Sequence, residues 1–249
     1  MILPNSIILG DCLDVMSDIP GGSVDMVLCD LPYGTTNCKW DCPIDLSSLW
    51  SQYNRIVKDS GAILLFAQTP FDKILGYSNI KNLRYEWIWE KSASTGFLNA
   101  KKMPLKAHEN ILVFYRKMPT YNPQKMDGFP VKKATRNVNV ANKGGIYGDI
   151  SKKTTYYEGD TTRYPRSVLK FKSDRYKFIG KDYHPTQKPV DLCEYLVKTY
   201  SNEGEVVLDN CAGSGTTGVA CKNSNRKYIL IEKEQKYHDM ILKRMNISD

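Results

Sequence analysis

Val206-Val-Leu-Asp-Asn-Cys-Ala-Gly-Ser-Gly-Thr-Thr-Gly218 and the nearby Tyr228-Ile-Leu-Ile-Glu232 together indicate the fold class of this chain. Both apolar runs are short and rich in β-branched residues, which is typical of buried parallel strands. A glycine-rich turn and a helix join them, and the second run ends in an acid, as in a nucleotide-binding crossover unit. The pattern predicts an α/β protein whose ligand lies at the carboxyl ends of the strands.

The charges around the turn narrow the choice of ligand. Gly213-Ser-Gly-Thr-Thr-Gly218 fits the dinucleotide spacing, so the glycines alone leave a pyrophosphate ligand open. Asp209 is an anion beside the turn, where it would oppose a pyrophosphate but could accept from an ammonium group. Glu232 is placed to accept hydrogen bonds from ribose hydroxyls. A cationic, phosphate-free nucleoside such as S-adenosylmethionine fits this pattern.

A second site is indicated by Asp30-Leu-Pro-Tyr-Gly34, which directly follows an apolar run at 24–29. The run predicts a buried strand whose carboxyl end carries a rigid polar corner. Pro32 has a fixed φ and biases Leu31 toward an extended conformation, which gives the Leu31 carbonyl and its neighbours defined directions. Two acceptors beside an aromatic ring suit a planar molecule that carries an amino group.

The rest of the chain alternates strand and helix patterns, which predicts crossover connections. We therefore expect a Rossmann-like α/β fold with a mainly parallel sheet of about seven strands flanked by helices. Strands are expected near 6–9, 24–29, 61–66, 85–89, 110–115, 206–209 and 228–232, and helices near 13–16, 44–58, 71–80, 189–197, 218–222 and 235–245.

The alternation is lost between about 117 and 183, where basic residues concentrate. Residues 116–182 contain 16 Lys and Arg against 6 Asp and Glu, a balance of +10, whereas the whole chain of 249 residues has +8. The remainder is therefore slightly acidic. Tyrosines lie among these cations, which favours a polyanionic, base-containing partner over a lysine-rich solvated loop. We interpret the segment as an insertion, because a structureless connection of this length is unusual in a compact domain.

Composition and cysteine usage exclude several classes of protein. With 41% hydrophobic and 25% charged residues the chain is of ordinary globular composition, and no apolar run is long enough to span a membrane. A secretory signal pattern is absent, so we expect a cytoplasmic protein. Seven scattered cysteines do not form a disulfide framework, and Cys38 with Cys42 lacks a second ligand pair, so no metal site is predicted.

The two motifs together resemble a known family. Asp30-Leu-Pro-Tyr33 is similar to the Asp-Pro-Pro-Tyr motif, and the loop at 209–216 to the cofactor loop, of S-adenosylmethionine-dependent DNA amino-methyltransferases. The catalytic motif comes first and the cofactor loop last, the circularly permuted order of the beta class. Gly10-Asp11 and His184-Pro-Thr-Gln-Lys-Pro189 agree with lesser motifs. The resemblance implies one catalytic and cofactor-binding domain made of 1–116 and 184–249, with 117–183 as an inserted target-recognition region.

This resemblance implies a mechanism and a set of site residues. The target base is flipped out of double-stranded DNA. Tyr33 then stacks on it, while the Asp30 carboxylate and the Leu31 carbonyl accept the two amino hydrogens as positive charge develops on nitrogen. Asp30, Leu31, Pro32 and Tyr33 are thus the expected catalytic residues. Those expected at the cofactor are Asp11, Thr186, Gln187, Lys188, Asp209, Ala212, Gly213, Ser214, Gly215, Thr216 and Glu232.

Leu31 departs from the family motif, which has proline there. Its expected role belongs to a backbone carbonyl, so we expect activity with a less rigid loop. Aspartate at position 30 favours adenine N6, although the stereochemistry also allows cytosine N4. Carbon-5 cytosine chemistry is disfavoured, because neither Cys29 nor Cys211 lies in a Pro-Cys context. An inert DNA-binding subunit of the same fold and, more distantly, a nicotinamide-linked oxidoreductase are the other interpretations; a homodimer and a cognate restriction enzyme are further expected partners.

Overall fold

The computed structural model describes residues 1–34, 41–131, 159, 161–173 and 187–246. The chain divides into two compact units. Unit 1 comprises Met1–Asn122 and Ser167–Asp249, and unit 2 comprises Pro123–Arg166. In unit 2 the described backbone is joined by a bridge between Met126 and Arg163. None of the described helices combines the length and hydropathy needed to cross a bilayer.

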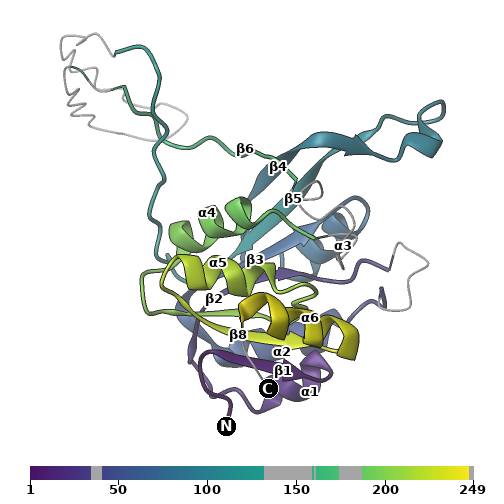
Figure 1. The fold of residues 1–249 in the computed structure, drawn as a ribbon, viewed down its shortest axis with the longest axis vertical. Coiled ribbons are helices and arrows are strands. Elements are labelled where there is room, and N and C mark those ends of the chain that lie inside the picture. Colours follow the sequence, from purple (N-terminus) through teal and green to yellow (C-terminus); the bar gives the residue numbers. More distant parts are fainter. Residues whose placement is uncertain (35–40, 132–158, 160, 174–186, 247–249) are drawn as a thin grey trace. The chain divides into compact units, whose positions relative to one another are not determined.

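Unit 1 is built on one sheet, and the described strands in it number eight, in the order β1-β8-β7-β2-β3-β5-β4-β6. All neighbouring pairs are parallel except those that β5 makes with β3 and with β4. The prediction of a mainly parallel α/β sheet is thus confirmed (Figure 1). The strands are β1 (Ser6–Leu9), β2 (Val24–Asp30), β3 (Val57–Ala67), β4 (Leu83–Thr95), β5 (Lys106–Phe114), β6 (Val168–Phe171), β7 (Val206–Asp209) and β8 (Lys227–Glu232).

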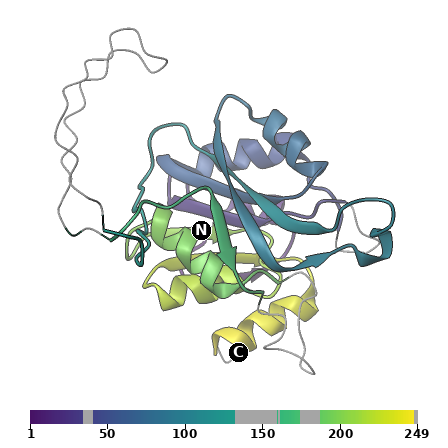
Figure 2. The same ribbon diagram turned by 90° about the horizontal axis from the view of Figure 1, so that it is seen from above.

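Helices cover both faces of this sheet (Figure 2). Alternate residues of β2 belong to two different cores: Val27 and Cys29 pack with the first three helices, and Met26 and Leu28 pack with the last three. A strand buried on both faces has to be apolar throughout, which explains the continuous run read in the sequence. The helices are α1 (Cys12–Ser17), α2 (Leu46–Ile56), α3 (Phe71–Ser78), α4 (Val190–Tyr200), α5 (Thr216–Asn223) and α6 (Gln235–Met245).

Local sequence fixes where the first helices begin. Asp11 accepts a hydrogen bond from the Leu13 N–H at 3.0 Å and caps α1, as its position predicts. Asp45 caps α2 in the same way, accepting from the Ser48 N–H at 2.8 Å. The helix predicted at 189–197 places Pro189 in its first turn, whereas in the structure Pro189 is the residue before α4, with ψ at 135°.

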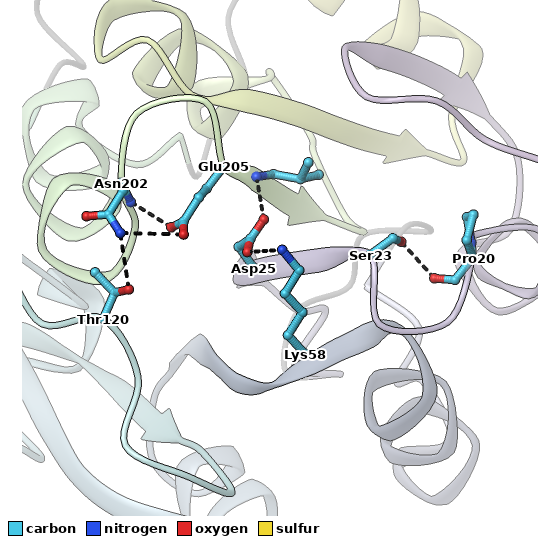
Figure 3. Close-up of polar contacts among 8 residues, drawn as sticks. Pro20, Ser23, Asp25, Lys58, Thr120, Asn202 and Glu205 are labelled. Atoms are coloured by element: carbon cyan, nitrogen blue, oxygen red, sulfur yellow. Dashed lines mark hydrogen bonds and ion pairs between the residues drawn. The ribbon is translucent and has the colours of Figure 1, made fainter.

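The amino ends of the central strands are tied together by polar contacts (Figure 3). Asp25 of β2 accepts from the Lys58 ammonium of β3 at 2.5 Å and from the Val206 N–H of β7 at 3.0 Å. Nearby, Asn202 donates to Glu205 through its backbone N–H at 2.7 Å. These contacts lie at the end of the sheet opposite the carboxyl ends of β2, β7 and β8, so they support the strands without entering the site described below.

Three strands run further than the sequence pattern indicates, and one falls in the expected insertion. β3, β4 and β5 extend beyond the predicted ranges of 61–66, 85–89 and 110–115, over exposed residues at 58–60, 92–95 and 106–108 that the apolar pattern does not mark. β6 pairs in parallel with β4 from Val168 to Phe171, inside the range assigned to the insertion. Residues 117–122 and 167–171 therefore belong to unit 1, and the second unit is shorter than the insertion predicted at 117–183.

Candidate active site

A cavity of about 800 Å³ opens at the carboxyl ends of the parallel strands in unit 1. Both predicted motifs line it, from β2 on one side and from β7 and β8 on the other. Gly215 is not part of the wall, and Thr186 lies outside the described residues. The predicted residues that line the cavity are Asp11, Asp30, Leu31, Pro32, Tyr33, Gln187, Lys188, Asp209, Ala212, Gly213, Ser214, Thr216 and Glu232.

The corner after β2 is rigid. The Tyr33 hydroxyl donates to Asp30 Oδ1 at 2.7 Å, and its ring stacks on Phe71, with centroids 5.1 Å apart and planes at 26°. Asp41 accepts from the Gly34 N–H at 2.8 Å, which closes the turn. Leu31 is 3% exposed and packs into the core beneath. The structure thus presents a carboxylate and an aromatic ring to one cavity.

An ion-pair chain lies behind Asp30. The Lys188 ammonium contacts Asp30 Oδ2 and also lies 3.2 Å from Glu109 Oε2, while Lys91 lies 2.6 Å from Glu109 Oε1. Lys188 further sits over the Phe66 ring, 5.1 Å from its centroid. The side chains of Lys188 and Glu109 are each 8% exposed, whereas that of Asp30 is 26% exposed because it faces the cavity. Lys188 is predicted at the cofactor, and its described partners are the carboxylates of Asp30 and Glu109.

The pKa values of the residues in and beside this ion-pair chain follow from burial and from charge pairing. Burial raises the pKa of Asp30, and the adjacent Lys188 opposes that rise. Burial would also raise the pKa of Glu109, but Lys188 and Lys91 outweigh it and lower the pKa to about 2. Burial together with the neighbouring Asp30 carboxylate raises the pKa of Tyr33, which stays a phenol. Lys188 is protonated, because its two carboxylate partners raise its pKa despite burial.

The cofactor loop is bound to the acid of the following strand. Glu232 accepts from the Gly213 N–H at 2.7 Å and from the Glu234 N–H at 2.8 Å, and each carboxylate oxygen keeps a further lone pair for a ribose hydroxyl. Gly215 has φ at +74°, and a Cβ there would lie 3.0 Å from Ile241, so a glycine is required. The buried Tyr53 hydroxyl supports the loop by donating to Asn210 Oδ1 at 2.6 Å.

Two buried polar groups in the cavity wall fit a cationic ligand with further acceptors. Asp209 is 4% exposed, and burial raises its pKa to about 6. A neighbouring positive charge would relieve that cost. Gln187 Nε2 is buried and makes no hydrogen bond to any described atom, so it is a donor that a ligand acceptor would satisfy. At the cavity edge, Asp11 is paired with Lys233 at 3.0 Å, a hydrogen bond that lowers the pKa of Asp11.

Sequence reasoning missed several members of the site. Glu109 and Lys91 face each other across the β4–β5 pair, near the pairing of Trp89 with Glu109, and no motif spacing marks them. Arg244 of α6 donates to the Ser214 carbonyl at 2.9 Å and to Thr216 Oγ1 at 3.0 Å, and so braces the cofactor loop. Within the described part of the chain, no group of three His, Cys, Asp or Glu could bind a metal ion.

Comparison with known proteins agrees with this geometry. A family model described as DNA methylase, covering both N6 and N4 enzymes, matches residues 24–243. The chain belongs to this family of DNA amino-methyltransferases. The match runs from the start of β2 into α6, so it includes both motifs that line the cavity and the segment between them, while β1, α1 and residues 244–249 lie outside it.

Individual relatives extend the match over nearly the whole chain. The DNA adenine methyltransferase YhdJ of Escherichia coli (strain K12) is 28% identical over 98% of this chain and 83% of its own length. The M1.HpyAVI–SAM complex superposes with a TM-score of 0.65 at 22% identity, covering 97% of this chain and 99% of that one. PvuII DNA methyltransferase, described as cytosine-N4-specific, gives 0.70 at 16% identity, covering 100% and 89%. The two structures show a shared fold.

Proposed function

We propose that the protein transfers a methyl group from S-adenosylmethionine to the exocyclic N6 of adenine in a short sequence of double-stranded DNA. The observation that carries this proposal is the single cavity that joins the Asp30–Tyr33 corner to the Asp209–Glu232 cofactor unit. A methyl donor in one half and an amino base in the other would meet within one cavity.

The catalytic corner acts by positioning and by charge. An exocyclic amino nitrogen is a poor nucleophile because its lone pair is delocalised into the ring. Asp30 and the Leu31 carbonyl accept the two amino hydrogens and favour a tetrahedral nitrogen, and they bind more strongly as positive charge develops there. Phe71 supports one side of the Tyr33 ring, which is therefore held as a flat platform for a flipped base. The Lys188 ammonium opposes the rise in the pKa of Asp30 that burial causes, and so favours the ionised form of Asp30.

The cofactor half supplies complementary groups. When bound, S-adenosylmethionine provides an electrophilic methyl group on a sulfonium. Asp209 would accept from the ammonium of its methionine portion, and Gln187 would donate to its carboxylate. Glu232 would accept from the ribose hydroxyls. The other residues predicted at the cofactor stay proposals for this role: Asp11, Ala212, Gly213, Ser214, Gly215, Thr216, Thr186 and Lys188. Among them, Lys188 contacts the carboxylates of Asp30 and Glu109.

Adenine is proposed over cytosine for two reasons. Aspartate stands first in the motif, and a DNA adenine methyltransferase is among the relatives with the broadest coverage. Cytosine N4 is the second candidate, because the cytosine-specific PvuII enzyme has the same fold and both bases offer an amino group beside a ring nitrogen.

The basic segment at 117–183 is proposed as the target-recognition region. In the described part of unit 2, Lys125 lies over the Tyr164 ring at 5.2 Å and Arg163 over the Phe129 ring at 5.5 Å. Cations and aromatic rings that lie together suit a partner with phosphates and bases. Lys132 and Lys133 lie outside the described residues. A homodimer and a cognate restriction enzyme are further proposals that follow from the family resemblance, and a cytoplasmic location is a proposal that follows from the sequence.

The proposal is tested by incubating the purified protein with unmethylated DNA and labelled S-adenosylmethionine, then hydrolysing the DNA and separating the nucleosides. Label in N6-methyl-2′-deoxyadenosine is expected, with none after Tyr33→Ala. Label in N4-methyl-2′-deoxycytidine would establish the second candidate. Binding of both ligands without any labelled nucleoside would point to an inert DNA-binding subunit.

A further inference from the structure

Strands β4 and β5 continue past the sheet as a two-stranded arm, residues 92–107 (Figures 1 and 2). The pairing of β6 with β4 ends at Lys91, and that of β3 with β5 stops at Asn110, so the described arm has no third strand beside it. Every residue of the arm is exposed. The strands nevertheless pair as far as Thr95 and Lys106. The arm is therefore an ordered β-hairpin whose side chains are not part of the hydrophobic core.

The tip of the arm presents two large apolar side chains to solvent. After Gly96, a 3-10 turn, η1 (Phe97–Asn99), leaves Phe97 81% exposed and Leu98 98% exposed. The backbone of the tip is satisfied internally: the Ala100 N–H donates to the Phe97 carbonyl at 3.0 Å, and the Lys102 N–H to the Asn99 carbonyl at 2.8 Å. Adjacent exposed apolar residues on an ordered tip indicate a contact surface.

The charge of the arm selects the kind of partner. Residues 92–107 include Lys101, Lys102 and Lys106 and contain no Asp or Glu. Among the residues that the structure describes, none of these three lysines forms an ion pair. Apolar residues flanked by cations and no acids fit a stacked, polyanionic partner, which is the chemistry of a nucleic-acid duplex.

The position of the arm gives the reason for that contact. Its inner side, including Ser94, Thr95, Asn99 and Met103, lines the cavity that also contains Asp30. A base that enters this cavity has to leave its stack beside the arm. Unstacking and unpairing cost a few kcal/mol, which an inserted apolar side chain can offset by filling the vacated space.

We propose that the arm is a DNA wedge. Phe97 and Leu98 insert into the base stack next to the target nucleotide, and Lys101 and Lys102 contact the flanking phosphates. This inference rests on the proposed function, and it adds how the duplex is opened, which the catalytic corner alone does not explain.

The test compares matched and mispaired DNA, with Phe97→Ser/Leu98→Ser as the variant. The substrates are two duplexes that carry the methylated sequence read from host DNA, one fully paired and one with a mismatch opposite the target base. A mismatch already weakens the base stack around the target nucleotide, so methylation of that duplex should not need the wedge. We expect kcat/KM on the paired duplex to fall by about tenfold or more, and the mismatch to restore most of it. Binding of S-adenosylmethionine should not change.

Ile74→Ser/Tyr77→Ser is the matched control. These side chains of α3 are 59% and 82% exposed and do not line the cavity, so the variant removes a comparable apolar surface elsewhere. It should behave as wild type on both duplexes. A second variant, Lys101→Gln/Lys102→Gln, should weaken DNA binding and reduce the slope of log affinity against log salt by about 2.

Other outcomes overturn the inference and show where it fails. Unchanged activity of the serine variant, or an equal loss on both duplexes, excludes a wedge while leaving the proposed function intact. A dimeric wild type with a monomeric serine variant would identify the tip as a contact between two copies of this chain. Failure of the wild type to methylate either duplex would remove the proposed function, and the wedge with it.

Discussion

Replacing Lys188 by methionine should shift the pH dependence of catalysis rather than abolish cofactor binding. Lys188 is buried between Asp30 and Glu109, and its charge opposes the rise in the pKa of Asp30 that burial causes. In the proposed mechanism Asp30 acts as a carboxylate, which accepts amino hydrogens more strongly than the neutral acid, and that ionised fraction is lost as pH falls through its pKa. Without Lys188 the pKa of Asp30 rises further, so activity should be lost from a higher pH.

The size of this shift follows from the geometry. An opposite charge in contact with a carboxylate typically lowers its pKa by about 1–3 units. Because the Asp30 side chain is 26% exposed to the cavity, solvent screening places the effect at the low end. We expect the acid limb of the profile of kcat against pH to move to higher pH by about one unit. At a fixed pH on that limb, this shift lowers kcat by about tenfold. Glu109 keeps Lys91 at 2.6 Å and therefore stays paired in the variant.

The assay is kcat against pH at saturating S-adenosylmethionine and DNA, normalised to folded protein, since breaking a buried pair can cost about 3–5 kcal/mol of stability. Lys58→Met is the control, because it breaks the pair with Asp25 at the other end of the sheet and should leave the profile in place. An unmoved acid limb together with a raised KM for S-adenosylmethionine would refute the role given to Lys188 and return it to the cofactor site.

Three further substitutions test neighbouring parts of the site. Asp209→Asn removes a buried carboxyl whose pKa burial raises from 3.8 to about 6. Ionising this carboxyl therefore lowers the free energy of unfolding above pH 6, and that cost disappears as pH falls from about 6 to 3.8. At pH 7 and without ligand the variant should have a free energy of unfolding up to ~3 kcal/mol higher, yet it should bind S-adenosylmethionine more weakly in calorimetry. Tyr53→Phe leaves Asn210 without its buried donor, and should cost about 1–3 kcal/mol while raising the KM for the cofactor more than it lowers kcat. Leu31→Ala empties a core position and should destabilise by about 2–5 kcal/mol in denaturant, but kcat per folded molecule should persist because the backbone carbonyl remains; a catalytic loss exceeding the folding loss would contradict that role.

The fold was largely predictable because its signals are local. Strands buried on both faces must be continuously apolar, so β2, β7 and β8 stand out in the sequence. The polar residues that follow them share one edge of a parallel sheet, and Asp30, Asp209 and Glu232 do line one cavity. Asp11 caps α1, a role that depends only on nearby residues.

What could not be predicted depends on pairing between distant strands. Glu109 reaches Lys188 only because β5 runs antiparallel beside β3, a register that no local pattern encodes. The motif at 184–189 predicts Lys188 at the cofactor, whereas its described partners are the carboxylates of Asp30 and Glu109. The arm at 92–107 is also invisible in the sequence, because its exposed apolar tip has no periodicity.

Sequencing that detects modified bases, applied to DNA from a methylation-free host, tests the central claim most directly. Cells expressing the wild-type protein should contain N6-methyladenine at one short recurrent sequence, and cells expressing Asp30→Ala should contain none. N4-methylcytosine in that sequence would contradict the choice of base, and N6-methyladenine that persists in the Asp30→Ala cells would contradict the catalytic role of the corner after β2.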